Sequence, residues 1–138
     1  MTVCVGNMCR SPIAEAALKE RLPKLRIASA GLEAPRGSRA DATAAEAAFA
    51  AGLDLKDHRA TRFDPADAST YDLILVMENA HKLRISEIAP QLSGRTMLMT
   101  HWTGGHEIPD PYRLPIEEHE KAISELLPAA DAWAKKIS

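Results

Sequence analysis

The chain of 138 residues is long enough for one domain with a hydrophobic core, and its 46% hydrophobic and 26% charged residues are ordinary for a globular protein. A net charge of −2 argues against a nucleic-acid partner, which normally requires a basic face. No apolar run approaches the roughly 20 residues of a membrane span, and the start does not resemble a signal peptide. Two cysteines alone do not make a secreted disulfide framework. We therefore expect one domain over residues 1–138 and a cytoplasmic location.

Apolar runs of strand length alternate with stretches of helical periodicity along the chain. The near-continuous apolar run at 73–77 is typical of a central parallel strand. Asp41 is a good N-cap for an alanine-rich helix, and Gly52 is its stop signal. Such alternation predicts a parallel sheet with right-handed crossovers. Strands are expected at 2–5, 25–30, 73–77 and 95–99, and helices at 12–21, 41–51, 79–88 and 116–137, with a short one starting at 64–65.

Two of these helices carry specific packing expectations. The helix at 116–137 has an apolar stripe at helical spacing, and Pro128 within that stripe should kink or break it, at about 3 kcal/mol if it stays regular. The helix at 79–88 offers three candidate inward residues, Leu83, Ile85 and Ile88. Elsewhere in the chain, two aromatic residues, Phe49 and Trp133, are expected in the core. The stretch from 100 to 115 is a long loop, and a loop of about 15 residues is more often functional than idle.

The stretch Cys4 to Pro12, Cys-Val-Gly-Asn-Met-Cys-Arg-Ser-Pro, joins the first predicted strand to the first predicted helix. The unpaired N–H groups of a helix start favour an anion, and Gly6 and Asn7 tolerate the dihedral angles that turn successive N–H groups inward. Such a loop binds a phosphate-like anion, with the guanidinium of Arg10 on two of its oxygens. A thiol in that field loses its proton easily, which makes Cys4 a candidate nucleophile. The candidate phosphate-binding residues are Val5, Gly6, Asn7, Met8, Cys9, Arg10 and Ser11.

Cys-x-Gly-Asn-x-Cys-Arg-Ser-Pro resembles the signature of the low-molecular-weight protein tyrosine phosphatases. The stretches at 29–31, 71–77 and 110–112 agree with that family in order, so the resemblance covers nearly the whole chain. Residues 29–32, 101–102 and 108–113 look most like bacterial members paired with tyrosine autokinases of exopolysaccharide export. The resemblance implies a three-layer α/β fold, whose four-stranded parallel sheet of order 2-1-3-4 has helices on both faces and a phosphate-binding loop after strand 1.

The resemblance also implies the reaction, hydrolysis of protein phosphotyrosine through a cysteinyl-phosphate intermediate without metal or cofactor. Arg10 is the expected phosphate clamp. Asp110 is expected to protonate the leaving phenolate and then to activate water, although Asp-Pro-Tyr taken alone is a common turn. Ser11 is expected to donate its hydroxyl to the Cys4 sulfur, to cap the helix, or both. The partners implied are a phosphotyrosine protein, such as a tyrosine autokinase, and oxyanions in the site, for a monomer or weak dimer.

Further roles follow from the same resemblance. Leu32 and Tyr112 are expected to form opposite walls of the substrate cleft. Ser29 and His58 are expected to support the loop, although His58 can also be an exposed loop histidine. Asp72 is expected to begin a strand and support the loop rather than to act in catalysis. Cys9 is expected either to form a reversible disulfide that protects Cys4 from over-oxidation or simply to pack.

Four other readings stay open at this point. Cys4 and Cys9 with His101 and His106 have zinc-ligand spacings, but about ninety residues separate the two pairs. Thiol-dependent arsenate reduction on the same fold uses later cysteines, which this chain lacks. Phosphoarginine phosphatases place a threonine where Met8 stands. The last reading is a catalytically silent phosphotyrosine binder, against which the presence of Cys4, Arg10 and Asp110 together argues.

Overall fold

The computed structural model describes residues 1–138, and its centre is one four-stranded sheet of order β2-β1-β3-β4. Every neighbouring pair of strands is parallel, so the predicted order and direction are confirmed. Each strand has three residues. The strand expected at 25–30 is found at 29–31 instead, because only these three residues pair with β1. The bounds are β1 (Thr2–Cys4), β2 (Ser29–Gly31), β3 (Ile74–Val76) and β4 (Thr96–Leu98).

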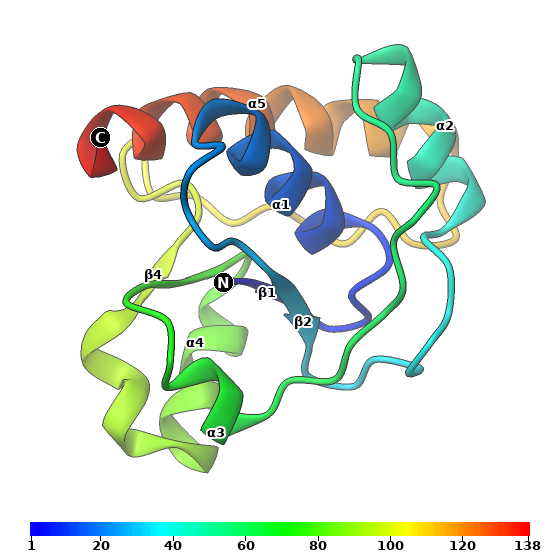
Figure 1. Cartoon of the computed structure of the whole chain (residues 1–138). Helices are drawn as coiled ribbons and strands as arrows, with labels where there is room; N and C mark the ends of the chain where they lie inside the picture. The colour runs from blue at the N-terminus through cyan, green and yellow to red at the C-terminus, as the bar shows by residue number, and fades with distance from the viewer.

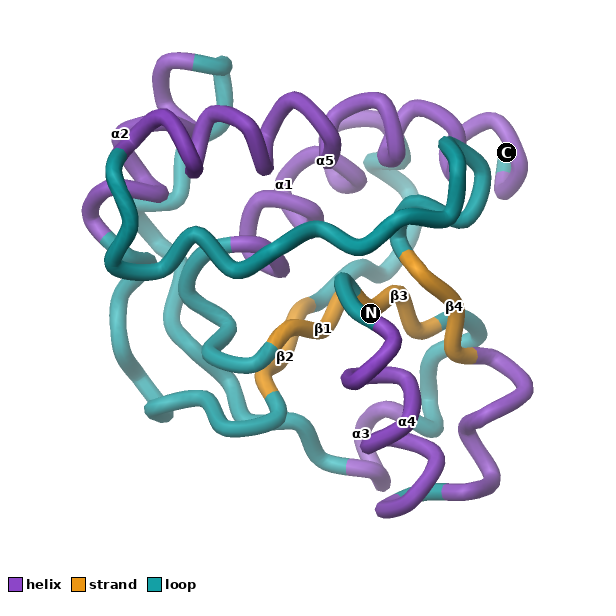
Figure 2. The backbone as a smooth tube through the Cα atoms, turned by 180° about the vertical axis from the view of Figure 1, so that it is seen from behind, coloured by secondary structure: helices purple, strands orange, loops and turns teal.

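Helices cover both faces of the sheet, as Figures 1 and 2 show. On one face lie α1 (Arg10–Arg21), α2 (Ala42–Ala50) and α5 (Ile116–Ile137); on the other lie α3 (Pro65–Ala68), α4 (Asn79–Ile88) and the short 3-10 helix η1 (Pro90–Arg95). Each face has its own hydrophobic cluster, and β3 contributes to both: Leu75 packs with the first group, and Ile74 and Val76 pack with the second. This alternation is the expected period of a strand that is buried on two sides.

Several helix expectations are corrected by the structure. α5 runs without interruption through Pro128, whose ring costs the helix one hydrogen bond while the neighbouring alanines are fully buried in the core. Phe49 is 73% exposed rather than in the core, because α2 packs through small alanines, which turns Phe49 outward. Leu83 and Ile88 are exposed as well, and α4 buries His81 and Ile85 instead. Trp133 lies in the core as predicted.

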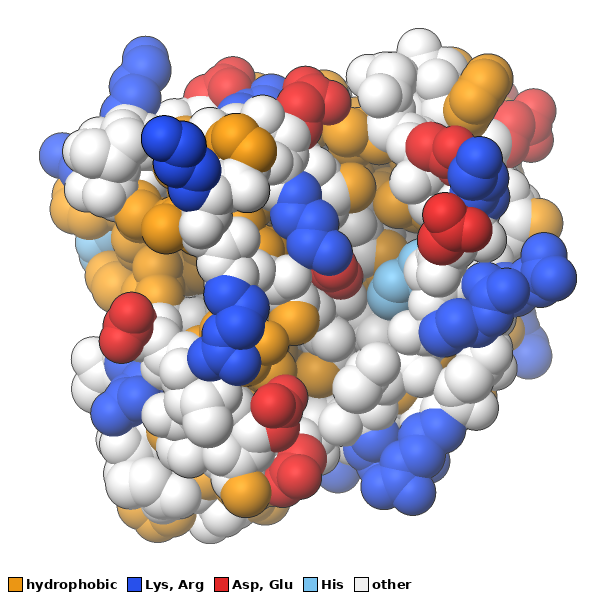
Figure 3. Space-filling view, in the orientation of Figure 1, with side chains coloured by type: hydrophobic (Ala, Val, Ile, Leu, Met, Phe, Trp, Pro, Cys, Tyr) orange, Lys and Arg blue, Asp and Glu red, His pale blue; other side chains and the backbone are white.

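The molecular surface carries charges of both signs. Acidic and basic side chains are interspersed over the face in Figure 3, in keeping with a net charge of −2. None of the helices combines the length and the apolar character that crossing a membrane would require.

Candidate active site

The phosphate-binding loop predicted from sequence follows the central strand β1. Cys4 is the last residue of β1, residues 5–9 form the loop, and α1 begins at Arg10. Among the backbone N–H groups from Val5 to Ser11, only that of Asn7 donates to an acceptor within the protein. The left-handed residue of the loop is Asn7, with φ of 53°, and Gly6 does not need a positive φ. The remaining N–H groups therefore form a set of free donors at a helix start, which is an anion-binding arrangement.

Cys4 lines a cavity of about 200 Å³, and because the residue is only 3% exposed, its sulfur lies at the cavity floor. Its Sγ is 3.0 Å from Ser11 Oγ and 3.3 Å from the Asn7 N–H that donates to it. Asn7 Nδ2 donates to the same Ser11 oxygen at 2.8 Å, so that oxygen accepts from Asn7 and its own proton is free to point at the sulfur. Two donors thus converge on Cys4, which stabilises a thiolate there.

The unusual turn at Asn7 is fixed by neighbours from other segments. Asn7 Nδ2 also donates to Ser29 Oγ at 2.9 Å, and Asn7 Oδ1 accepts from the Thr61 N–H at 2.8 Å. The backbone carbonyl of Asn7 lies 2.6 Å from His58 Nε2. Asn7 is fully buried, and each polar atom of its side chain has a partner. Ser29 and His58 therefore lie where loop support requires them.

Two predicted site residues lie elsewhere. Asp72 is next to the amino end of β3, in a different cavity with Met1 and Leu73, whereas the phosphate loop follows the carboxyl end of parallel β1. The expectation that Asp72 supports the loop is therefore wrong. Leu32 is buried in the hydrophobic cluster beside α4 and is absent from the cavity lining, so it forms no wall of the cleft. The wall on that side consists of Glu33 and Pro35.

Arg10 has partners that the sequence analysis missed. It is 1% exposed, and its Nη1 donates to Glu78 Oε2 at 2.5 Å and to the Ile108 carbonyl at 2.7 Å. Its Nε is buried without a partner in the protein. Burial, and next the charge of Arg10, lower the pKa of His81, so its neutral ring accepts the Glu78 N–H at Nδ1. Glu78 therefore orients the guanidinium and leaves the Nε edge for an anion.

The long loop between β4 and α5, which crosses below α5 in Figure 2, brings Asp110 and Tyr112 to the cavity that contains Cys4. Asp110 Oδ2 is 3.7 Å from Arg10 Nη2, and Asp110 Oδ1 accepts the Tyr112 N–H at 3.1 Å. The Asp110 side chain is 45% exposed, so it stands at the mouth while the sulfur lies at the floor. Tyr112 lines the cavity as predicted, and its ring is 5.2 Å from the Arg113 guanidinium.

The second thiol, Cys9, is a free cysteine, like Cys4, and lines the same cavity. Burial and then the nearby carboxylates of Asp41 and Asp110 raise the pKa of Cys9 above its usual range, so this thiol stays protonated. His101 and His106 are exposed and do not join the two cysteines, so the zinc set proposed from their spacing does not form. Protection of Cys4 by Cys9 stays a prediction.

Gly31 packs directly against the backbone of the phosphate loop. A Cβ at this position would lie 2.6 Å from the Val5 carbonyl oxygen and 2.8 Å from the Asn7 nitrogen. Gly31→Ala should therefore displace the phosphate loop, lowering stability by about 1–3 kcal/mol and kcat/KM by about 10- to 100-fold. Thermal melts and aryl phosphate kinetics measure both.

The matched control is Gly94→Ala, since nothing lies within 4 Å of a Cβ there. Equal behaviour of the two alanine variants would mean that close packing at Gly31 does not shape the loop.

Comparisons with known proteins agree with this geometry. The family model described as Low molecular weight phosphotyrosine protein phosphatase matches residues 1–138. The low molecular weight protein-tyrosine-phosphatase Wzb of Salmonella typhimurium is 44% identical over 138 residues, which cover 100% of this chain and 93% of that protein. The tyrosine phosphatase Wzb from Escherichia coli K30 in complex with sulphate superposes with a TM-score of 0.97 at 46% identity, covering 99% of this chain and 96% of the other.

A more distant structure shares the fold. The YwlE arginine phosphatase from Geobacillus stearothermophilus matches with a TM-score of 0.92 at 32% identity, covering 99% of this chain and 90% of the other. Because the family model matches over the full length and the Salmonella typhimurium relative is 44% identical over 138 residues, the chain belongs to the low molecular weight phosphotyrosine protein phosphatase family.

Proposed function

We propose that residues 1–138 act as one catalytic domain that hydrolyses protein phosphotyrosine through a phosphocysteine at Cys4. One observation carries the proposal: the Cys4 sulfur, a set of free backbone N–H groups and the unpartnered Nε of Arg10 surround one cavity. A phosphoryl group above Cys4 places its oxygens against these donors, which stabilise the charge that develops in the transition state.

In the first step, the Cys4 thiolate attacks phosphorus and the bond to the phenolic oxygen breaks. Asp110 gives its proton to that oxygen, which is why its place at the cavity mouth matters. In the second step, Asp110 takes a proton from water, the water oxygen attacks phosphorus, and the S–P bond breaks. The departing Cys4 sulfur is stabilised by the Ser11 hydroxyl and the Asn7 N–H. Inorganic phosphate leaves, and no cofactor takes part.

Depth and lining favour an aryl phosphate as substrate. Because Cys4 is only 3% exposed and lies at the floor, the phosphoryl group must be carried in on a long stem. Met8, Pro35 and Tyr112 give the cavity apolar walls that suit a flat ring. Phosphoserine has a shorter stem, and the threonine of phosphoarginine phosphatases is replaced here by the bulky Met8. Phosphotyrosine is the substrate that fits both features.

Replacing the proposed general acid tests the assignment. Asp110→Asn keeps the shape and the acceptor for the Tyr112 N–H but removes the transferable proton, so kcat on phenyl phosphate should fall about 100- to 1,000-fold with little change in KM. The loss should be smaller on p-nitrophenyl phosphate, whose leaving group needs a proton less.

Glu33→Gln is the matched control for this variant, because it removes the same charge from the rim of the same cavity. Its kcat should stay within about threefold, since an exposed charge acts weakly at a distance. Equal kcat values for Asp110→Asn and wild type on phenyl phosphate would remove Asp110 from the mechanism.

A substrate panel distinguishes the proposed function from its alternatives. Peptides carrying phosphotyrosine, phosphoserine or phosphoarginine are offered to the wild type and to Cys4→Ser. We expect kcat/KM for phosphotyrosine to exceed the other two by about 100-fold or more. A preference for phosphoarginine would make the chain a phosphoarginine phosphatase instead. Phosphopeptide binding without phosphate release by the wild type would make it a catalytically silent phosphotyrosine binder.

The cellular setting is the finer part of the proposal. We propose a cytoplasmic enzyme, monomeric or weakly dimeric, that acts on a tyrosine autokinase or its substrates in exopolysaccharide production. Support comes from the similarity to bacterial relatives named Wzb, together with the motifs at 29–32 and 108–113. Incubation with a phosphorylated bacterial tyrosine autokinase should release phosphate in a Cys4-dependent manner.

A further inference from the structure

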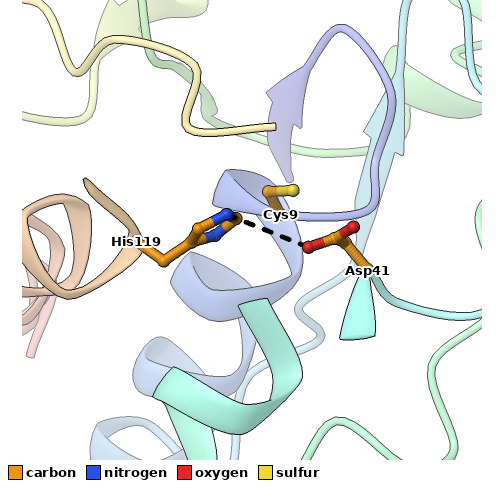
Figure 4. A group of neighbouring side chains, drawn as sticks. All are labelled: Cys9, Asp41 and His119. Carbon is orange, nitrogen blue, oxygen red and sulfur yellow. Dashed lines mark ion pairs between the residues drawn. The ribbon is translucent and has the colours of Figure 1, made fainter. Parts of the chain in front are cut away.

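Behind the phosphate loop, side chains from three helix starts come together. Cys9 is the N-cap residue of α1, Asp41 is the N-cap residue of α2, and His119 lies in the first turn of α5. Figure 4 shows them pointing toward one another. One ligand-type atom from each, a sulfur, a carboxylate oxygen and a ring nitrogen, lies within 4.8 Å of the other two. The proposed phosphatase chemistry uses neither the Asp41 nor the His119 side chain.

His119 is the unusual member of this cluster. It is 1% exposed, and neither ring nitrogen has a hydrogen-bond partner. The charged group nearest to it, the Asp41 carboxylate, is 3.9 Å from Nε2, which is beyond hydrogen-bond distance. A buried polar side chain almost always has partners, because leaving it without them costs stability. An unpartnered imidazole aimed at a thiol and a carboxylate therefore indicates a missing ligand.

The chemistry of the three donors selects that ligand. A thiolate sulfur, a neutral imidazole nitrogen and a carboxylate oxygen are together the preferred donors of Zn²⁺, at about 2.0–2.3 Å from the metal. Ligands at those distances in a tetrahedron stand roughly 3–4 Å apart, so side-chain rotations without backbone rearrangement close the present separations. We propose that Cys9, Asp41 and His119 form a Zn²⁺-binding site whose fourth position is taken by water.

When Zn²⁺ binds, it replaces the proton on the Cys9 sulfur. The zinc–sulfur bond forms as the thiol proton leaves to solvent, and no electron is transferred. The Asp41 N–H donates to the Met8 carbonyl at 3.0 Å, and Cys9 itself belongs to the phosphate loop, so the ion lies directly against that loop. A zinc-bound Cys9 is also unable to pair with Cys4. The site is separate from the reaction at Cys4 and does not depend on the proposed substrate.

The experiment compares Zn²⁺ binding by reduced, chelator-stripped protein, measured by competition with a chromogenic chelator. We expect one Zn²⁺ per chain in the wild type, in Cys4→Ser and in the matched control His106→Phe. His119→Phe should bind at least about 100-fold more weakly. With Co²⁺ as the probe, a sulfur-to-cobalt charge-transfer band should appear in Cys4→Ser and be absent in Cys9→Ser.

Thermal melts show that the variants are folded and add a second readout. Without metal, His119→Phe should melt no lower than the wild type, because no hydrogen bond is lost. Zn²⁺ should raise the melting temperature of the wild type and leave that of His119→Phe unchanged. Asp41→Asn, which keeps an oxygen to cap α2, should also lose the zinc-dependent rise.

Three outcomes would overturn the site. The first is no Zn²⁺ bound by the wild type at tens of micromolar metal. The second is binding lost in Cys4→Ser but kept in His119→Phe, which would place the ion on the catalytic thiol. The third is undiminished binding in both Cys4→Ser and His119→Phe, which would place the ion on the surface.

Discussion

Cys4→Ser should lower kcat on aryl phosphates by about 10⁴-fold or more while phosphate binding persists. The sulfur receives hydrogen bonds from the Ser11 hydroxyl at 3.0 Å and the Asn7 N–H at 3.3 Å. These donors stabilise a thiolate, but neither is a base that can deprotonate a serine hydroxyl. The serine variant therefore keeps the anion-binding donors and loses the nucleophile. Steady-state kinetics, rapid quenching for a phosphoprotein and phosphate titration measure the three parts.

Cys9→Ser is the matched control, because this second cysteine lines the same cavity and contributes only its backbone N–H to the proposed phosphate site. Its activity should stay within about tenfold of the wild type. If Cys4→Ser kept more than about a tenth of the activity, the nucleophile would lie elsewhere. If both variants lost activity equally, disruption of the loop rather than loss of the nucleophile would explain the effect.

Arg10→Lys should lower kcat/KM by about 1,000-fold although the positive charge is kept. The nitrogens of the guanidinium have different partners. Nη1 donates to Glu78 and to the Ile108 carbonyl, and the unpartnered Nε remains available to the anion. A lysine ammonium can neutralise Glu78, but it cannot also span two phosphoryl oxygens in one plane. The loss should appear in phosphate affinity as well as in kcat.

Stability should fall too, by about 2 kcal/mol, because the Ile108 carbonyl loses its donor and the hydrogen bond from Nη1 to Glu78 is lost. Glu78→Gln separates positioning from charge: it keeps an acceptor for Nη1 and should cost only about tenfold in kcat/KM. A lysine variant with nearly wild-type kcat/KM would show that charge alone is sufficient and that the planar fork has no role.

Local signals were enough to predict the phosphate loop. The residues from Cys4 to Ser11 are contiguous, and their N–H groups, thiol and guanidinium are placed by one strand-to-helix turn. The sheet order came from the family resemblance, and the structure confirms it. Asn7 was recognised as the residue for an unusual turn, but its φ of 53° is permitted by contacts with segments far along the chain, which periodicity does not reveal.

The far walls of the site were harder to predict, since they depend on the paths of separate loops. Leu32 and Pro35 are three residues apart, yet one faces the core and the other the cavity. The sequence contained enough information to place Glu78, rather than Asp72, near the phosphate loop. In a parallel sheet, residues before β3 lie away from that loop and residues after β3 lie beside it. The prediction that Phe49 is buried was wrong because the alanine face of α2, rather than its largest residue, packs against the core.

The contacts around Asn7 have a consequence for product inhibition. Ser29, His58 and Thr61 fix the turn through the folded chain, without any contribution from a bound anion. The conformational entropy of ordering the loop is therefore lost during folding, and an anion binds to a site that is already ordered. Inorganic phosphate binds to the same ordered site as the transition state does. Competition by the released product is thus inherent in the architecture, and turnover should slow as phosphate accumulates.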